Sequence, residues 1–372
     1  MPLRLAAFYF AFFVYAGLMV AYFPPYLAAR GLSAVQISWV LALPQIVRVF
    51  APALWGSIAD RSGALRGIVC LGCAANALCF ALVPFAPRFA AIAVLVTAAS
   101  LASAAALPLV EAITLGALAG EPGRYGPIRL WGSIGFIAAV LAGGAWLDFH
   151  RMETLPIALV VFSLGSFAVA LALPRSTVHV RPSATQLALS REALALLAAS
   201  FWMALAHGVL YAFLTLHLRE QGYGSTLIGV LWSLGVLAEI AVFVLLPALF
   251  RRYALSSILM ASCVIAIVRF SAIGRAAGLL PVLVLAQLMH AATFGAFHAG
   301  AVASVRRVFP EHAQGRGQTL FSSLGYGAGG ASGALAAGWA WEAGGAAAAF
   351  SLAALAGALG LLFAYPLRRA GL

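Results

Sequence analysis

The chain is a succession of long apolar segments separated by short polar ones. Of its 372 residues, 64% are hydrophobic and 9% are charged, and this composition excludes an ordinary soluble globule. A helix needs about 20 apolar residues to cross the hydrocarbon core of a bilayer. Segments of that length recur along the whole sequence, and we expect twelve spans, at approximately 5–29, 35–58, 66–86, 89–118, 127–147, 153–173, 193–218, 226–249, 254–274, 279–305, 317–340 and 345–367.

The first apolar segment is predicted to remain in the protein as a membrane span. It is long for a signal peptide, it has no convincing small-residue cleavage site before Arg30, and eleven further spans follow it. The pattern therefore predicts an all-α, polytopic protein embedded in a lipid bilayer.

The charge distribution indicates which side of the membrane each loop faces. The formal net charge is +12, and all 22 basic residues are arginines. Five of them fall on one set of alternating loops (Arg30, Arg88, Arg151, Arg219 and Arg275) and fourteen on the other, which marks the cytoplasmic side. We therefore expect a bacterial inner-membrane protein with both termini in the cytoplasm, and the basic excess does not indicate binding to nucleic acid. The fourteen are Arg4, Arg61, Arg66, Arg124, Arg175, Arg181, Arg191, Arg251, Arg252, Arg306, Arg307, Arg316, Arg368 and Arg369.

The two halves of the chain resemble each other at an offset of 191 residues. Residues 31–37, before the second span, resemble residues 222–228, before the eighth. A polar stretch at 174–192 joins the halves, so we expect two six-helix bundles, residues 1–183 and 184–372. Duplicated bundles of this kind build transporters whose binding site lies near the middle of the membrane.

Five charged side chains lie inside segments that are otherwise apolar enough to span: Arg48, Glu111, Arg129, Glu239 and Arg269. Each costs about 2.5–3.5 kcal/mol at the membrane centre on insertion scales. Such residues normally lie along a polar pathway through the protein. At the offset of 191, Arg48 and Glu239 occupy equivalent positions of the two repeats, and the other three charged residues have no charged counterpart. This asymmetry suits one small ligand held between two different walls.

Distance from the connecting turns predicts which of these charges lie at the same depth. Glu111 and Arg129 are equally far from the turn between their helices, and Glu239 and Arg269 are at comparable depths around the next such turn in the second half. Two pairs are therefore possible, either as part of a binding site or only to hold helices together.

The intramembrane arginines outnumber the intramembrane glutamates by three to two. The excess positive charge favours an anionic ligand, such as a substrate carboxylate. We assign Arg48 to this role; the alternative is that Arg48 contacts backbone carbonyls or packs at a helix break near Pro44 and Pro52.

Glu239 and His290 are the candidates for proton coupling. A carboxylate whose neighbours change between outward- and inward-facing states can load and release a proton, and imidazole exchanges protons near neutral pH. The alternative for His290 is a hydrogen-bonded packing role, which we expect for His207, His217 and His298. Trp232 lies two turns before Glu239 on the same helical face, where it either stacks on a substrate ring or packs in the core.

Two sequence patterns that resemble cofactor sites are interpreted as packing. Cys70-x-x-Cys73 lies inside a span with no second cysteine pair, and Gly325-x-Gly327-x-x-Gly330 follows no strand, so its glycines are expected to let helices approach closely. The sequence has no H-E-x-x-H and no G-x-S-x-G. We expect no cofactor, no metal and no enzymatic activity, although a membrane-embedded enzyme and a non-transporting sensor are the alternatives from other classes.

A loop after the second predicted span resembles a signature of the major facilitator superfamily. The stretch Gly56-Ser-Ile-Ala-Asp60-Arg61-Ser-Gly63 is similar to G-x-x-x-D-[RK]-x-G. In that family the acidic residue of this loop gates the cytoplasmic side, so the resemblance implies this role for Gly56, Asp60, Arg61 and Gly63.

Other segments resemble, within that superfamily, the phenylpropionate/proton symporter group and, related to it, lactose permease. They are Pro108-Leu-Val-Glu111-Ala, the run from Tyr125 through Arg129 to Phe136, the run from Leu231 to Ile240, and the run from Ala286 to Phe294. The separation of Glu111 and Arg129 matches that of the sugar-binding Glu and Arg of lactose permease. The likeness covers nearly the whole chain, from Ala21 in the first span through the eleventh.

The chain departs from lactose permease at residues that contact its sugar or carry its proton. Phe136 stands where that protein stacks a Trp on the sugar, Thr293 where it has its proton-carrying Glu, and Val236 where it has a sugar-binding Glu. These changes favour another solute. At Val140 the chain also lacks the G-P of the drug/proton antiporter signature, which favours import over efflux.

The sequence therefore predicts a proton-coupled importer of a small organic solute, an aromatic or other monocarboxylate, that works as a monomer. A sugar or nucleoside symporter is the alternative, and an efflux antiporter is less favoured. The expected substrate-binding residues are Arg48, Glu111, Arg129, Phe136, Trp232 and Arg269, with Glu239 and His290 coupling the proton.

Overall fold

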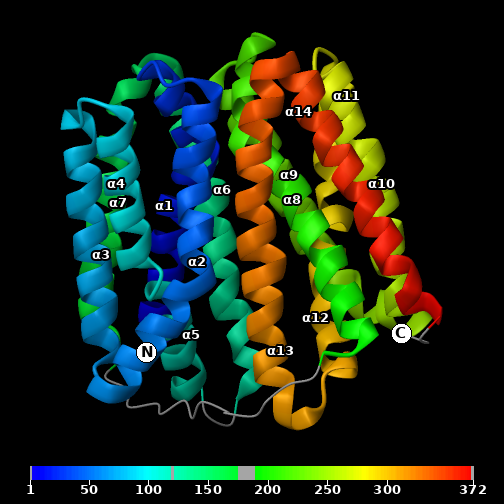
Figure 1. The fold of residues 1–372 in the computed structure, drawn as a ribbon. Helices are drawn as coiled ribbons and strands as arrows, with labels where there is room; N and C mark the ends of the chain where they lie inside the picture. Colours follow the sequence, from blue (N-terminus) through cyan, green and yellow to red (C-terminus); the bar gives the residue numbers. More distant parts are fainter. Residues whose placement is uncertain (1, 119–120, 175–188, 370–372) are drawn as a thin grey trace. The chain divides into compact units, whose positions relative to one another are not determined.

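The computed structural model describes residues 2–118, 121–174 and 189–369, almost all of them helical (Figure 1). The chain divides into two compact units, one of Met1–Arg181 with Gly224–Val230 and one of Pro182–Tyr223 with Leu231–Leu372. The expected boundary between residues 183 and 184 lies outside the described residues. Within the described ranges no strand is formed, as the all-α prediction requires.

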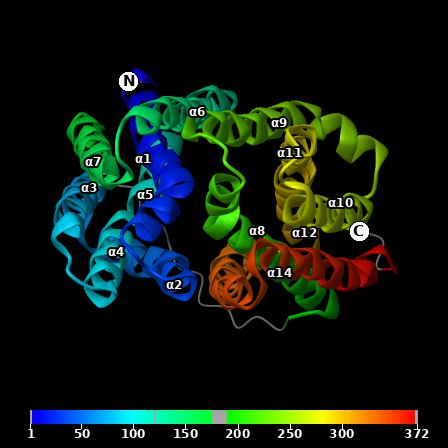
Figure 2. The same ribbon diagram turned by 90° about the horizontal axis from the view of Figure 1, so that it is seen from above.

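The first unit is a bundle in which α1 packs against α6 and α7, α3 against α4 and α7, and α2 against α4 (Figure 2). Phe8, Tyr9, Val69 and Val110 are fully buried in its core. Its helices are α1 (Pro2–Ala29), α2 (Ala34–Ser62), α3 (Leu65–Leu82), α4 (Phe89–Ser103), α5 (Ala106–Ala117), α6 (Tyr125–Phe149) and α7 (Leu155–Leu171), together with the first residues of α9 (Ser225–Arg252).

Small residues bring α1 and α6 into close contact. A Cβ built on Gly135 would overlap the carbonyl oxygen of Phe10, and one built on Gly17 would lie 3.0 Å from the carbonyl oxygen of Phe136. Close approach of this kind is typical of membrane helices, whose association depends on packing rather than on the hydrophobic effect.

The second unit is arranged around α8, which packs along α14 (Figure 2). Gly208 and Gly333 make this possible, because a Cβ on either one would overlap a carbonyl oxygen of the facing helix. The helices are α8 (Arg191–Glu220), the rest of α9, α10 (Leu255–Ala276), α11 (Leu280–Leu288), α12 (Phe297–Val308), α13 (Gln314–Leu320) and α14 (Gly329–Arg369), with π-helical segments at Ala291–Ala296 and Phe321–Ala328.

The described residues contain eleven helices long and apolar enough to cross a membrane, of which the last, Glu311–Arg369, has 59 residues. At 1.5 Å per residue it would be about 88 Å long, far more than the roughly 30 Å of hydrocarbon. Gly344 and Gly345 have non-helical φ/ψ values, and Figure 1 shows the orange and red halves of α14 turning there and running in opposite directions. Divided at this turn, the run gives two spans and brings the number to the twelve expected.

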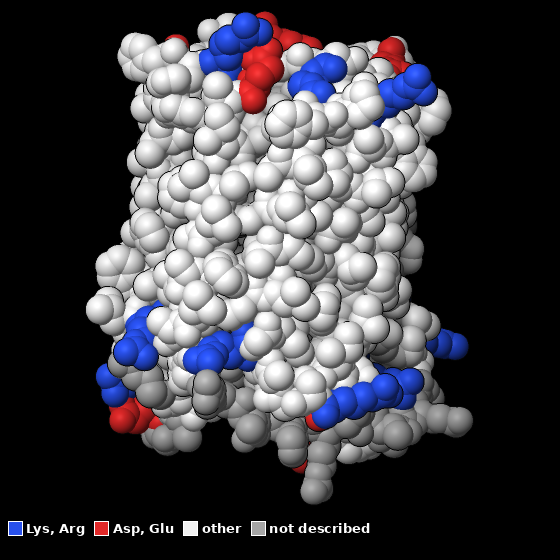
Figure 3. Space-filling model, turned by 90° about the vertical axis from the view of Figure 1, so that its left-hand side faces the viewer, with Lys and Arg blue, Asp and Glu red and all other residues white. Residues whose placement is uncertain are grey.

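Charged side chains gather at the two ends of the face that Figure 3 shows. On the face shown in Figure 3, Arg, Asp and Glu side chains form two groups with a broad uncharged band between them. An apolar band bounded by charged ends is the surface that a bilayer requires.

Candidate functional site

The five intramembrane charges differ widely in burial. Arg269 is fully buried, the side chains of Arg129 and Glu111 are 31% and 38% exposed, and that of Glu239 is 19% exposed. Arg48, near the middle of α2, is exposed. Of these five side chains, Arg269 alone is completely buried.

Glu111 and Arg129 lie next to each other, as their equal distance from the connecting turn predicts. Arg129 Nε is 4.0 Å from Glu111 Oε1, and the Tyr125 hydroxyl donates to the same carboxylate oxygen at 3.4 Å. The Arg129 guanidinium lies over the ring of Phe13, 4.3 Å from its centroid, and 5.5 Å from that of Tyr9. Within the described residues Arg129 donates no hydrogen bond, so its five N–H groups remain able to bind an acceptor.

Arg269, in contrast to Arg129, donates hydrogen bonds to three described residues. Its Nε donates to the carbonyl oxygen of Ala286 at 2.8 Å, Nη1 to Thr293 Oγ1 at 2.8 Å, and Nη2 to Gln287 Oε1 at 3.2 Å. The expected ion pair with Glu239 is not among the contacts between described residues. The buried guanidinium instead holds α10 to α11 and to the π-helical segment Ala291–Ala296 through neutral acceptors.

The hydrogen bonds around His207 fix its tautomer. Its Nδ1 lies 2.9 Å from the carbonyl oxygen of Met203, and a carbonyl only accepts, so Nδ1 carries the proton. In the neutral ring Nε2 is the acceptor and receives the hydroxyl of Thr293 at 3.5 Å, whose oxygen also accepts from Arg269. With His207 neutral, the three residues form one directed chain of hydrogen bonds.

His290 is an ionisable neighbour of Glu239. His290 Nε2 lies 3.9 Å from Glu239 Oε2, and His290 Nδ1 is buried with no hydrogen-bond partner among the described residues. The ring of His290 stacks on Phe294 at 5.2 Å and lies 5.7 Å from that of His207. The two residues that the sequence analysis predicts to couple the proton therefore lie next to each other in the structure.

The two aromatic candidates lie in different surroundings. Trp232 is buried and stacks on Tyr211, with the two ring centroids 6.1 Å apart, and its Nε1 donates to Thr215 Oγ1 at 3.0 Å. These contacts fit the core-packing alternative for Trp232. Phe136 is partly exposed on α6, two turns beyond Arg129, so a contact with a ligand remains a prediction for this residue.

The predicted gating motif ends α2. Gly63 caps the helix in the left-handed conformation (φ 63°), and its N–H donates to the carbonyl oxygen of Ala59. Glycine adopts this conformation without strain, which explains the last residue of the motif. Asp60 is partly buried and Arg61 exposed; their gating role is not tested by these contacts.

Sequence reasoning missed Gln287 and Asp148. Gln287 holds Arg269, and its three-residue spacing to His290 was the signal that one helical face carries both. Asp148, at the end of α6, accepts from the backbone N–H groups of Ser225 at 2.6 Å and Thr226 at 3.0 Å and thereby caps α9. Nothing local to either sequence segment indicates that contact.

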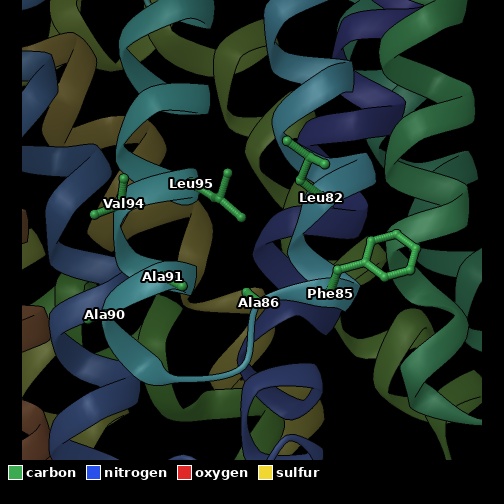
Figure 4. Close-up of a pocket in the computed structure, with 7 residues that line it drawn as sticks. All are labelled: Leu82, Phe85, Ala86, Ala90, Ala91, Val94 and Leu95. Carbon is green, nitrogen blue, oxygen red and sulfur yellow. The ribbon is translucent and has the colours of Figure 1, made fainter.

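A surface groove of the first unit has none of these charges in its lining. It has a volume of about 560 Å³, opens between α3 and α4, and is lined by apolar side chains only (Figure 4): Leu82, Phe85, Ala86, Ala90, Ala91, Val94 and Leu95. Such a lining does not suit a charged solute.

Comparison with known proteins agrees with this architecture. Residues 2–352 match the model of the MFS_1 like family. The chain is 28% identical over 309 residues to a probable 3-phenylpropionic acid transporter of Escherichia coli (strain K12), covering 80% of each chain. It is 29% identical over 368 residues to the maltose permease of Geobacillus stearothermophilus, covering 95% of this chain and 92% of that protein.

Solved structures share the fold at low sequence identity. A crystal structure of the nucleoside transporter NupG superposes with a TM-score of 0.82 at 20% identity, covering 99% of this chain and 98% of that one. The transporter PepTSo, of the POT family, gives a TM-score of 0.79 at 11% identity, over 99% of this chain and 97% of that one. With its family match, its helical membrane fold and its transporter relatives, this chain belongs to the MFS_1 like family and is a secondary transporter of the major facilitator superfamily, not an enzyme.

Proposed function

We propose that this transporter is a proton-coupled symporter that imports an aromatic or other monocarboxylate by alternating access. It works as a monomer in the bacterial inner membrane, with both termini in the cytoplasm. The moving parts are the two six-helix bundles of residues 1–183 and 184–372.

The observation that carries this proposal is the guanidinium of Arg129. It lies within a membrane span, is partly exposed, is 4.0 Å from the Glu111 carboxylate and donates no hydrogen bond to a described residue. A carboxylate offers a guanidinium two parallel hydrogen bonds. Arg129 therefore binds the substrate carboxylate, Glu111 orients Arg129, and Arg48 adds a second positive charge. The 3-phenylpropionic acid transporter among the relatives supports an aromatic acid.

Glu239 and His290 couple the proton. They lie 3.9 Å apart, whereas the hydrogen bonds of His207 and Arg269 are already directed to neutral partners. A proton bound by the Glu239–His290 pair in one state is released when their separation changes in the other.

Uptake of labelled 3-phenylpropionate into proteoliposomes, with and without an inward pH gradient, tests the proposal. We expect uptake to be accelerated by the gradient, abolished by Arg129→Ala and unaffected by Arg124→Ala, which removes an exposed arginine paired with Glu121 at the surface. Wild-type uptake by folded Arg129→Ala protein would refute the carboxylate assignment. Uptake indifferent to the gradient would refute proton coupling.

A sugar or nucleoside symporter is the second candidate, because the maltose permease covers more of this chain at similar identity. Thermal-shift measurements with 3-phenylpropionate, maltose and uridine separate the two. Stabilisation by maltose or uridine alone would replace the carboxylate assignment.

A further inference from the structure

The contact between α1 and α6 shapes the surroundings of Arg129. Gly132 lies one turn after Arg129, and a Cβ there would be 2.7 Å from Arg129 Nη1 and 2.9 Å from Cδ2 of the Phe13 ring. Real Cβ atoms are essentially never that close to another heavy atom. A side chain at position 132 would therefore displace the guanidinium or the Phe13 ring from the places they occupy.

The Phe13 ring supplies a specific attraction as well as a surface. The Arg129 Cζ lies 4.3 Å from its centroid, well within the range of about 6 Å in which a cation is drawn to the face of an aromatic ring. The carboxylate of Glu111 lies 4.0 Å from Nε. Ring and carboxylate together restrict the directions in which the remaining N–H groups can point.

We propose that Phe13 and Gly132 are positioning residues that hold Arg129 in the orientation that binds the substrate carboxylate. The inference rests on the proposed function, because it assumes that Arg129 is the carboxylate ligand. Phe13 and Gly132 act through Arg129 and recognise the negative charge of the substrate indirectly. Their substitution therefore lowers the preference for an acid over its uncharged analogue.

Inhibition of uptake by 3-phenylpropionate and by 3-phenylpropanamide tests this, since the amide has the same ring and chain without the negative charge. Phe13→Leu keeps an apolar side chain but removes the ring, and we expect it to raise KM for the acid by about 2- to 5-fold, the equivalent of a partly exposed cation–π contact. Vmax and inhibition by the amide stay near wild type. Phe13→Tyr, which keeps the ring, restores the KM of the wild type.

Gly132→Ala is expected to raise KM further, because its Cβ displaces both partners. Gly126→Ala is the matched control: Gly126 lies on the same helix with no atom within 4 Å of a built Cβ. Phe10→Leu is the control on α1, because the Phe10 ring contacts Trp131. Phe13→Leu and Gly132→Ala proteins with the acid-over-amide preference of the wild type would overturn the proposal, as would equal losses for acid and amide.

A readout without substrate separates this inference from the proposed function. Modification of Arg129 by phenylglyoxal, followed by mass spectrometry, should be faster in Phe13→Leu than in wild type, with the exposed Arg88 as internal reference. Equal rates in both proteins would overturn the positioning role even if no carboxylate is transported. If the wild type does not bind 3-phenylpropionate but phenylglyoxal modifies Arg129 faster in Phe13→Leu, the substrate assignment is refuted. The positioning of Arg129 by Phe13 is then retained.

Discussion

Replacing Thr293 by Val should destabilise the second unit, because it removes the acceptor of a buried charged donor. Thr293 is fully buried, accepts from Arg269 Nη1 at 2.8 Å, and donates to His207 Nε2 at 3.5 Å. Valine has nearly the same shape, so little packing is lost. Hydrogen bonds to charged groups contribute about 1.5–3 kcal/mol, whereas neutral interhelical hydrogen bonds in membrane proteins average about 0.6 kcal/mol. We expect a loss near the lower end of the charged range, about 1.5 kcal/mol.

Equilibrium unfolding in mixed detergent micelles measures this loss. Thr293→Ser keeps the hydroxyl and should recover most of the stability. Thr97→Val is the control, because the Thr97 hydroxyl bonds only to the carbonyl oxygen of Ala93 on its own helix among the described residues. A Thr293→Val protein within about 0.5 kcal/mol of wild type, the range of ordinary surface substitutions, would refute the reasoning that Arg269 depends on this acceptor.

Three further predictions follow from single contacts. Asp148→Ala should speed hydrogen exchange at the first two amides of α9, which both donate to this carboxylate, whereas Glu153→Gln, in an exposed pair, should leave them unchanged. Gly333→Ala should lower the yield of folded protein, because its Cβ would overlap a carbonyl oxygen of α8, whereas Gly165→Ala, which meets nothing within 4 Å, should not. Glu239→Gln should retain substrate binding in a thermal-shift assay and lose acceleration of uptake by a pH gradient; acceleration at the wild-type level would remove Glu239 from proton coupling.

The spans could be predicted from the sequence because hydrophobic length is a local property. The two ends of α2 are also determined by nearby residues. Ser33 and Gln36 form a capping box at its start, and Gly63 ends it in the left-handed conformation. The division of α14 is marked in the same way by the pair Gly344-Gly345. In each case the residues that decide the structure lie within a few positions of the feature.

The outcome differed for the two predicted charge pairs, and the reason is geometric. Counting residues from a turn gives depth in the membrane but not the direction in which a side chain points. For Glu111 and Arg129, the depth and the side-chain direction both allow contact. The Arg269 side chain instead donates to Gln287 and Thr293. Direction depends on helix rotation, which apolar composition leaves undetermined.

The π-helical segment Ala291–Ala296 makes this direction still harder to predict. A π-helix closes its hydrogen bonds at i→i+5 rather than i→i+4, so each such turn shifts the phase of all later residues relative to an α-helical count. His290 lies immediately before the segment and Thr293 within it. An α-helical extrapolation across this segment therefore misplaces Thr293 relative to α10.

The direction of the hydrogen bonds narrows the choice of proton carrier within the second unit. Arg269 donates to Thr293, Thr293 to His207, and His207 to the carbonyl oxygen of Met203. A proton added to His207 would go to Nε2, where the Thr293 hydroxyl donates in the neutral ring, and the Thr293 oxygen would then accept from both His207 and Arg269. His290 Nδ1 has no hydrogen-bond partner among the described residues, and His290 Nε2 lies 3.9 Å from the carboxylate of Glu239. This arrangement supports the proposal that His290 and Glu239, 3.9 Å apart, couple the proton.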